Sequence, residues 1–176
     1  VRTCLLTLED IEETAGSRVA SFDLTLTPEW NLVSIPVHPA DDRPASVFGS
    51  NLAGPVWEYD AAEGAYRETS NVRPRHGYWV YWSGPETTIR ITGETVADTA
   101  LRNAGRGWHL VSPVAQPPYP AFGPSWLSDT DLRVLSPIYY YEEGQYSEAT
   151  TDLQSGAGYW IFVNEPGNIP LGVTTE

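Results

Sequence analysis

Apolar and polar residues begin to alternate strictly at Ser21. Phe22, Leu24 and Leu26 occupy one face of this segment, and Asp23, Thr25 and Thr27 occupy the other. A period of two predicts a half-buried β-strand, and Pro28 ends it. Residues 1–20 lie before this pattern and carry a patch of four acidic residues between positions 9 and 13. We expect them to form one short helix or the tail of a preceding module.

Short β-rich runs joined by turns continue along the rest of the chain. Residues 60–64 and 142–144 each end in a glycine, which adopts positive φ at little cost, so we predict a β-hairpin at each. Fifteen Pro and 15 Gly separate the runs. Because no ten-residue stretch has a convincing helical period, the sequence predicts an all-β chain.

The chain also repeats itself. Trp-Asn-Leu-Val-Ser at 30–34 returns as Trp-His-Leu-Val-Ser at 108–112, a spacing of 78, and Gly-Tyr-Trp at 77–79 returns at 158–160, a spacing of 81. The hairpin between these motifs is repeated too, and Gly93 corresponds to Gly172. The spacing drifts only where loops would absorb it, which indicates a tandem duplication.

Two copies are too few for a solenoid, and a propeller blade would repeat after roughly 40 to 50 residues. We therefore predict two antiparallel β repeats, related by a pseudo-twofold axis and packed as a sandwich or barrel-like domain. The expected organisation is an N-terminal extension or tail of a preceding module at 1–20, β repeat 1 at 21–96 and β repeat 2 at 97–176.

Together these motifs resemble a repeat of large secreted and cell-surface proteins of bacteria and archaea. That repeat commonly reads Gly-Trp-Asn-Leu-Ile-Ser, followed by Gly-Lys-Gly-Tyr-Trp, and the resemblance spans residues 22–173. It implies an extracellular or cell-surface location and neighbouring domains in a longer chain, but no activity. Glu29 stands where the pattern has Gly, and His109 stands where the first copy has Asn31. If Asn31 ties a turn through its side chain, the second copy must satisfy that turn differently.

Seven Trp and ten Tyr are distributed over both copies. Both copies need a core but only one need bind a ligand, so we expect aromatic residues present in both to fill the core. The pairs are Trp30 with Trp108, Trp57 with Tyr139, Tyr59 with Tyr141, Tyr66 with Tyr146, Tyr78 with Tyr159, and Trp79 with Trp160. Residues 77–82 are apolar on both faces, which predicts a central strand covered on both sides.

Aromatic residues without a counterpart are the candidates for ligand binding. Tyr140 stands opposite Glu58 of the first copy, and a face that tolerates a charge is expected to be exposed. The candidate ligand-binding residues are Tyr140, Trp82, Tyr119, Phe122 and Trp126. The last three lie on a proline-rich excursion, which would present them as a stiff ridge or simply cap the end of the barrel.

Charge and cysteine content narrow the classes of partner. Acidic residues number 23 against ten basic ones, all Arg, and a net charge of −13 repels nucleic acid and anionic membranes. Cys4 is the single cysteine, so no intrachain disulfide can form. No leader-like or membrane-spanning run is present, and Met is absent even at position 1, so we expect a segment of a longer or processed protein without a membrane span.

Catalytic and metal-binding patterns are missing from the sequence. His38, His76 and His109 have no metal-ligand spacing, and we expect no metal site and no cofactor. Calcium would have to use Asp41 with Asp42, Asp60 with Glu63, or Asp129 with Asp131, but no 12-residue loop frames them. A glycosidase needs two facing carboxylates, and the sequence nominates no pair.

The sequence thus favours a non-catalytic extracellular module, structural or adhesive, of a larger surface or secreted protein. Its partners would be neighbouring domains of the longer chain and a glycan or surface protein. A carbohydrate-binding module that uses the unpaired aromatic residues is the alternative, and a glycosidase is the third hypothesis.

Overall fold

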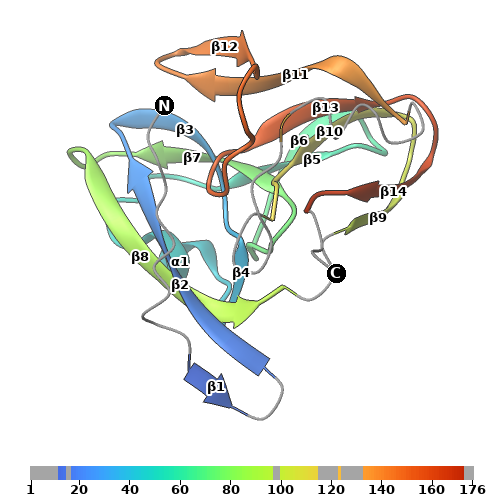
Figure 1. The fold of residues 1–176 in the computed structure, drawn as a ribbon. Helices are drawn as coiled ribbons and strands as arrows, with labels where there is room; N and C mark the ends of the chain where they lie inside the picture. The colour runs from blue at the N-terminus through green and yellow to red at the C-terminus, as the bar shows by residue number, and fades with distance from the viewer. Residues whose placement is uncertain (1–11, 15–16, 97–99, 115–122, 124–132, 173–176) are drawn as a thin grey trace.

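The computed structural model describes residues 12–14, 17–96, 100–114, 123 and 133–172. Over these residues the chain is all-β, with antiparallel sheets and a single short helix, α1 (Pro44–Phe48), that the sequence did not predict (Figure 1). The strands are β1 (Glu12–Thr14), β2 (Ser17–Leu26), β3 (Glu29–Ser34), β4 (Val37–Pro39), β5 (Trp57–Asp60), β6 (Ala65–Glu68), β7 (Gly77–Trp82), β8 (Thr87–Thr95), β9 (Ala100–Ala104), β10 (Gly107–Val111), β11 (Val134–Glu142), β12 (Gln145–Glu148), β13 (Tyr159–Val163) and β14 (Gly167–Pro170).

The strands of the described chain form three four-stranded sheets and one two-stranded sheet. Two of the larger sheets have the orders β3-β7-β5-β6 and β10-β13-β11-β12, and the third has the order β1-β2-β8-β4. The two-stranded sheet pairs β14 with β9. β7 contains the first Gly-Tyr-Trp motif and β13 contains the Tyr-Trp of the second. Each of these strands lies between two other strands, as predicted for the first copy.

Both predicted hairpins are present. β5 pairs with β6 and β11 pairs with β12, each across a turn with positive φ. Gly64 has φ 65° in the first turn, and Glu143 and Gly144 have φ 51° and 81° in the second. The alternating segment at 21–27 lies in β2, with Phe22, Leu24 and Leu26 at most 5% exposed. β2 begins at Ser17, so the described part of the N-terminal extension is extended rather than helical.

The described residues form two hydrophobic cores, one within residues 20–91 and the other within residues 101–171, and we call these two parts of the chain its halves. In the first, Phe22 and Leu26 of β2 and Ile91 of β8 meet Tyr78 and Val80 of β7, so the sheets that contain β2 and β7 face each other across it. In the second, apolar side chains of β9 and β14 meet those of β10, β11 and β13, including Val111, Ile161 and Ile169. The apolar alternation of each strand sets which side chains enter these cores.

Candidate functional site

The two halves meet along a contact between the sheets β3-β7-β5-β6 and β10-β13-β11-β12, which we call the seam. Ser34 N–H donates to Gly156 O (2.9 Å), and Ser112 N–H donates to Arg75 O (3.1 Å). Ser34 and Ser112 close the two Trp-x-Leu-Val-Ser motifs and are fully buried. Sequence reasoning did not single out these serines, although their repetition at the spacing of the motif was a signal.

Two glycines bring the backbones of the halves into contact. A Cβ atom on Gly77 would lie 2.7 Å from Leu110 Cγ and 3.3 Å from Gly158 Cα, and one on Gly158 would lie 3.0 Å from Leu32 Cγ and 3.4 Å from Gly77 Cα. The glycine that begins each Gly-Tyr-Trp motif therefore packs against the Trp-x-Leu-Val-Ser leucine of the other half. A side chain at either position would push the halves apart.

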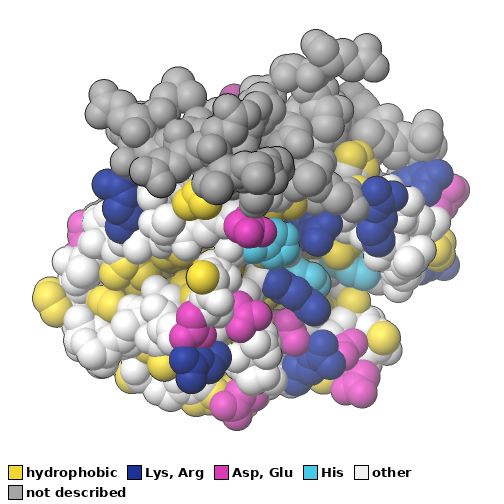
Figure 2. Space-filling model, turned by 90° about the horizontal axis from the view of Figure 1, so that it is seen from below, with side chains coloured by type: hydrophobic (Ala, Val, Ile, Leu, Met, Phe, Trp, Pro, Cys, Tyr) yellow, Lys and Arg dark blue, Asp and Glu magenta, His cyan; other side chains and the backbone are white. Residues whose placement is uncertain are grey.

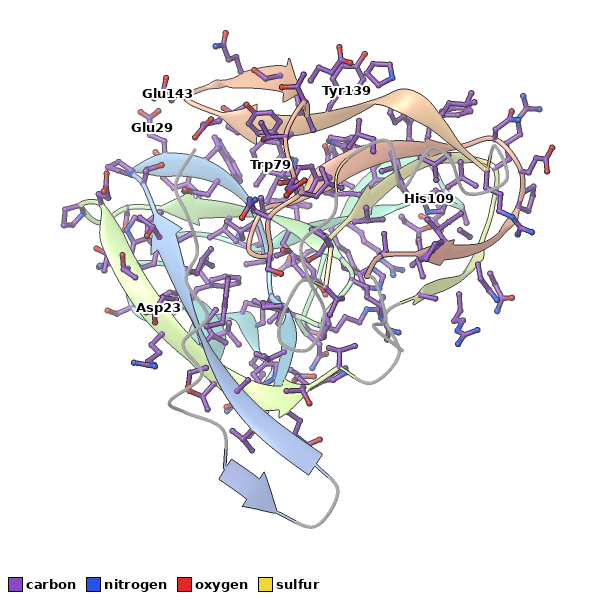
Figure 3. The ribbon with its side chains drawn as sticks, in the orientation of Figure 1. Asp23, Glu29, Trp79, His109, Tyr139 and Glu143 are labelled. Atoms are coloured by element: carbon purple, nitrogen blue, oxygen red, sulfur yellow. The ribbon has the colours of Figure 1, made fainter. Side chains whose placement is uncertain are left out.

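Aromatic rings cross the seam in matching contacts. The ring centroids of Tyr59 and Trp160 are 4.7 Å apart, and those of Trp79 and Tyr141 are 4.6 Å apart, both at 76°. Trp79 lies between β7 and the hairpin of β11 and β12 (Figure 3). We call the following residues the aromatic belt: Tyr59, Tyr66, Trp79, Tyr141, Tyr146 and Trp160, with Trp30 and Trp108 at its ends.

The expectation that all paired aromatic residues fill the core is wrong. Tyr78 and Tyr159 are buried, at 0% and 5% exposed, but Trp30, Tyr66, Trp108 and Tyr146 are 40–51% exposed. In the strict alternation of β7, Tyr78 points into the core, and Trp79 consequently points to the seam. Aromatic residues that are paired in the sequence therefore supply a surface as well as a core.

Glu58, the first-half residue opposite Tyr140, does not lie on an exposed face, contrary to expectation. Glu58 is 8% exposed, and its carboxylate lies 2.9 Å from Arg67 Nε and 3.8 Å from Arg73 Nη2. Two arginines neutralise this carboxylate, so its charge does not mark an exposed face. Tyr140 is accordingly half-buried and packs against the second core and Tyr159.

Trp82, a second candidate for ligand binding, is 2% exposed and belongs to the first core. Its indole N–H donates to Pro85 O (2.9 Å). Because the ring is buried, it offers no face to a ligand, and the structure does not place Trp82 in a binding surface. Tyr119, Phe122 and Trp126 lie outside the described residues.

A cleft of about 420 Å³ opens between β2 and β3 on one side and β11 and the 149–157 segment on the other. Half-buried Tyr140 and exposed Trp30 both line it. Hydrogen-bonding side chains surround them, among them Thr25, Thr27, Asn31, Thr151 and Gln154. The cleft, which we call the seam cleft, is also lined by four acidic residues: Asp23, Glu142, Glu143 and Asp152. It thus combines aromatic, amide, hydroxyl and acidic groups, and the structure brings Tyr140 to it.

A second space, of about 370 Å³, lies along the aromatic belt. Every described residue that lines this aromatic pocket is a tyrosine or tryptophan: Tyr59, Trp108, Tyr139, Tyr146 and Trp160. All five were expected in the core because each has an aromatic counterpart in the other half of the sequence. Tyr139 is seen on β11 in Figure 3.

The three histidines are far apart in the sequence, but in the structure His38 and His76 both lie near Arg75, and His109 lies near His76. Burial lowers the pKa of His38, and Arg75 adds to this. Burial and then Arg73 lower the pKa of His76 to about 3, with Arg75 and His109 adding to the effect. Figure 2 shows histidine side chains gathered among arginines on the face seen from below. His76 is therefore neutral near pH 7.

The turn before each Trp-x-Leu-Val-Ser strand is held differently in the two halves. The Asn31 amide accepts from Thr27 N–H (3.0 Å) and donates to Thr27 O (2.8 Å) and Glu29 O (3.0 Å). In the second half His109 Nε2 lies 2.8 Å from Gly105 O. His109 and Gly105 are each 78 residues after Asn31 and Thr27, so the imidazole replaces part of the amide network.

Two of the acidic pairs considered for calcium are held by other partners. The Arg43 guanidinium donates two hydrogen bonds to Asp41, and the Ser46 hydroxyl and the Arg43 backbone N–H each donate one. These bonds hold the pKa of Asp41 well below its usual value. Asp60 accepts N–H groups of its own turn and lies 3.0 Å from Arg67 Nη1. Within the described residues, no group of three or more His, Cys, Asp or Glu could hold a metal ion. Asp129 and Asp131 lie outside the described residues.

In the part of the chain that the structure describes, no helix is long and apolar enough to cross a membrane. No protein-family model, curated protein or solved structure matches this chain, so its geometry carries the functional argument.

Proposed function

We propose that this chain is a non-catalytic structural or adhesive module of a larger secreted or cell-surface protein, and that it binds its partner through the aromatic belt at the seam. The observation that carries this proposal is the exposure of paired aromatic residues, with Trp30, Tyr66, Trp108 and Tyr146 at 40–51%. Soluble domains rarely leave large apolar side chains grouped at the surface without an interaction to cover them.

The duplication is the second part of the proposal: two copies of one β unit related by a pseudo-twofold axis through the seam. Support comes from contacts that match in both directions. The hydrogen bond from Ser34 to Gly156 corresponds to that from Ser112 to Arg75, since the donors are 78 residues apart and the acceptors 81. Such reciprocity is the property of an isologous interface.

A rigid seam suits a structural module. Backbone hydrogen bonds and the Gly77–Gly158 contact fix the two halves relative to each other. Each exposed ring of the belt makes an edge-to-face contact with a neighbouring ring. Side chains that are already ordered lose little conformational entropy when a partner binds.

Retention of the isolated chain on a glycan array and on immobilised cell-surface protein tests the proposal. We expect at least one surface to retain the chain and Trp108→Ala with Tyr146→Ala to reduce that retention about tenfold or more. Leu135→Ala is the matched control, because Leu135 is also 40% exposed but is not part of the belt. Unchanged retention of the double variant would refute recognition through the belt.

Carbohydrate binding at the seam cleft is the second candidate. It is favoured by the combination of Tyr140 and Trp30 with hydroxyl, amide and carboxylate side chains, which together suit the apolar faces and hydroxyl groups of a sugar. Tyr140→Ala and Thr151→Ala would then abolish retention on a glycan, whereas Trp108→Ala would not. Retention that depends on Trp108 alone would exclude the cleft.

The carboxylates of the seam cleft provide the sharpest challenge to a non-catalytic role. Asp23 comes from β2 and Glu142 from β11, so acidic groups of both halves line one space. Release of reducing sugar from any glycan that the chain retains, abolished by Asp23→Asn or Glu142→Gln, would replace the proposal with a glycosidase. We expect no release over a day of incubation.

A further inference from the structure

The rings that line the aromatic pocket are steeply inclined to one another. The ring planes of Trp108 and Trp160 meet at 85°, those of Tyr59 and Trp160 at 76°, and those of Trp108 and Tyr139 at 47°. Rings at such angles do not form the flat platform on which a sugar ring or a nucleobase stacks. They border an open space of about 370 Å³ that a compact group can enter.

The polar groups of the lining residues are few. Tyrosine and tryptophan side chains offer only phenol hydroxyl and indole N–H groups, and no amide or carboxylate side chain is among the described lining residues. A sugar placed here would leave most of its hydroxyl groups without partners, which is costly. A quaternary ammonium group needs no hydrogen bond: its methyl groups contact the rings and its charge is attracted to their faces.

Charge around the pocket favours the same ligand. Glu148 stands directly opposite Tyr139 in the pairing of β12 with β11, so its exposed carboxylate lies beside the pocket, on the same face as Tyr146. The net charge of −13 attracts a cation and opposes an anion. A free cation therefore suits the pocket better than a headgroup that carries a phosphate.

We propose that the aromatic pocket binds a small free quaternary ammonium cation of the choline type, in contact with the rings of Trp108, Trp160 and Tyr139, with Glu148 at its rim. This inference rests on the proposed function, because it assigns a ligand class to the same aromatic belt. The binding energy comes from cation–π attraction and methyl contacts, so loss of the positive charge at constant shape removes most of it.

Calorimetric titration of the chain with choline chloride, at low salt, tests the proposal against a neutral ligand of the same shape. The comparison ligand is 3,3-dimethylbutan-1-ol, which replaces the ammonium nitrogen with carbon. We expect saturable binding of choline, about tenfold tighter than that of the alcohol and tighter than that of phosphocholine. Equal affinity for choline and the alcohol would overturn the proposal, as would the absence of saturable choline binding.

Two matched pairs of variants locate the site. Trp108→Ala should weaken choline binding about tenfold, whereas Leu135→Ala, at an equally exposed position that does not line the pocket, should leave it unchanged. Glu148→Gln should weaken it about twofold, and Glu68→Gln, which makes the same change of net charge at the equivalent position of β6, should not. If Trp108→Ala does not fold, the titrations of Trp108→Phe and the two glutamine variants decide. Equal losses in both members of a pair would refute the assignment.

Failure of this inference can be separated from failure of the proposed function. If choline does not bind but the belt variants lose retention on a glycan or protein surface, the ligand class alone is wrong. If choline binds through Trp108 while the Trp108 and Tyr146 double variant keeps full retention, the aromatic pocket exists but the belt does not hold the partner.

Discussion

Gly77→Ala should separate the two halves of the seam and destabilise the whole chain. A Cβ atom at position 77 would lie 2.7 Å from Leu110 Cγ and 3.0 Å from its Cδ1, where ordinary contact begins at 3.4 Å. Leu110 is 4% exposed, so its side chain has little space into which to move. The new Cβ atom cannot shift far from Leu110 either, because it would lie only 3.3 Å from Gly158 Cα. Overpacking of this kind costs about 1–3 kcal/mol, more than the gain of about 0.4–1 kcal/mol from reducing the entropy of the unfolded chain.

Urea unfolding measured by tryptophan fluorescence provides the assay. Gly158→Ala should have a smaller effect, within about 1 kcal/mol, because its closest contact is 3.0 Å and its neighbour must yield by only a few tenths of an ångström. Gly105→Ala is the control, since a Cβ atom there meets no atom within 4 Å, and it should change stability by less than about 0.5 kcal/mol.

A double variant identifies the cause. Leu110→Ala alone should cost about 2–5 kcal/mol through the cavity it leaves, but combined with Gly77→Ala it should cost less than the sum, because the new methyl group enters that cavity. A Gly77→Ala variant as stable as Gly105→Ala, or an additive double variant, would refute the close packing of the seam.

Three further changes test other parts of the structure. Burial lowers the pKa of His76 to about 3 from the usual histidine value of about 6.5. Its neutral form therefore stabilises the fold fully above pH 6.5, and this contribution is lost as pH falls toward 3. Urea unfolding should show that the wild-type chain loses up to about 2 kcal/mol more stability than His76→Gln between pH 7 and 5. The hydroxyl of Tyr78 accepts a hydrogen bond from Arg73 N–H (2.9 Å) in the core, so Tyr78→Phe should lower the free energy of unfolding by about 1–2 kcal/mol. Tyr159→Phe removes the acceptor of Gln154 N–H and should lower it by a similar amount. Unchanged stability in both variants would contradict these hydrogen bonds. Glu29 has φ 77° where the other half has Gly107 at φ 131°. Glu29→Gly should therefore raise stability to thermal unfolding by up to about 1 kcal/mol, and Gly107→Ala should lower it. The opposite order would exclude backbone strain at this turn.

Local patterns predicted the parts of the fold that depend on local physics. The alternation at 21–27 predicted a strand that buries Phe22 and Leu26, and the glycine turns predicted the hairpins of β5 with β6 and β11 with β12. Strand period and turn conformation are properties of a few consecutive residues, so the sequence alone contains them. The nearly constant spacing of the motifs, 78 to 81 residues, predicted a duplication in the same way. The duplication and the arrangement of the copies are part of the proposal.

The candidate site depended on contacts between distant residues. Strand alternation placed Tyr78 and Trp79 on opposite faces of β7, but it did not determine which face meets a core and which meets another sheet. Glu58 appeared to mark an exposed face because nothing in its own strand revealed Arg67 and Arg73 beside it. The sequence thus determined the strands, the turns and the inventory of aromatic rings. Only the tertiary structure decided which rings are buried and which remain at the surface, because burial depends on what packs against a strand and not on the strand itself.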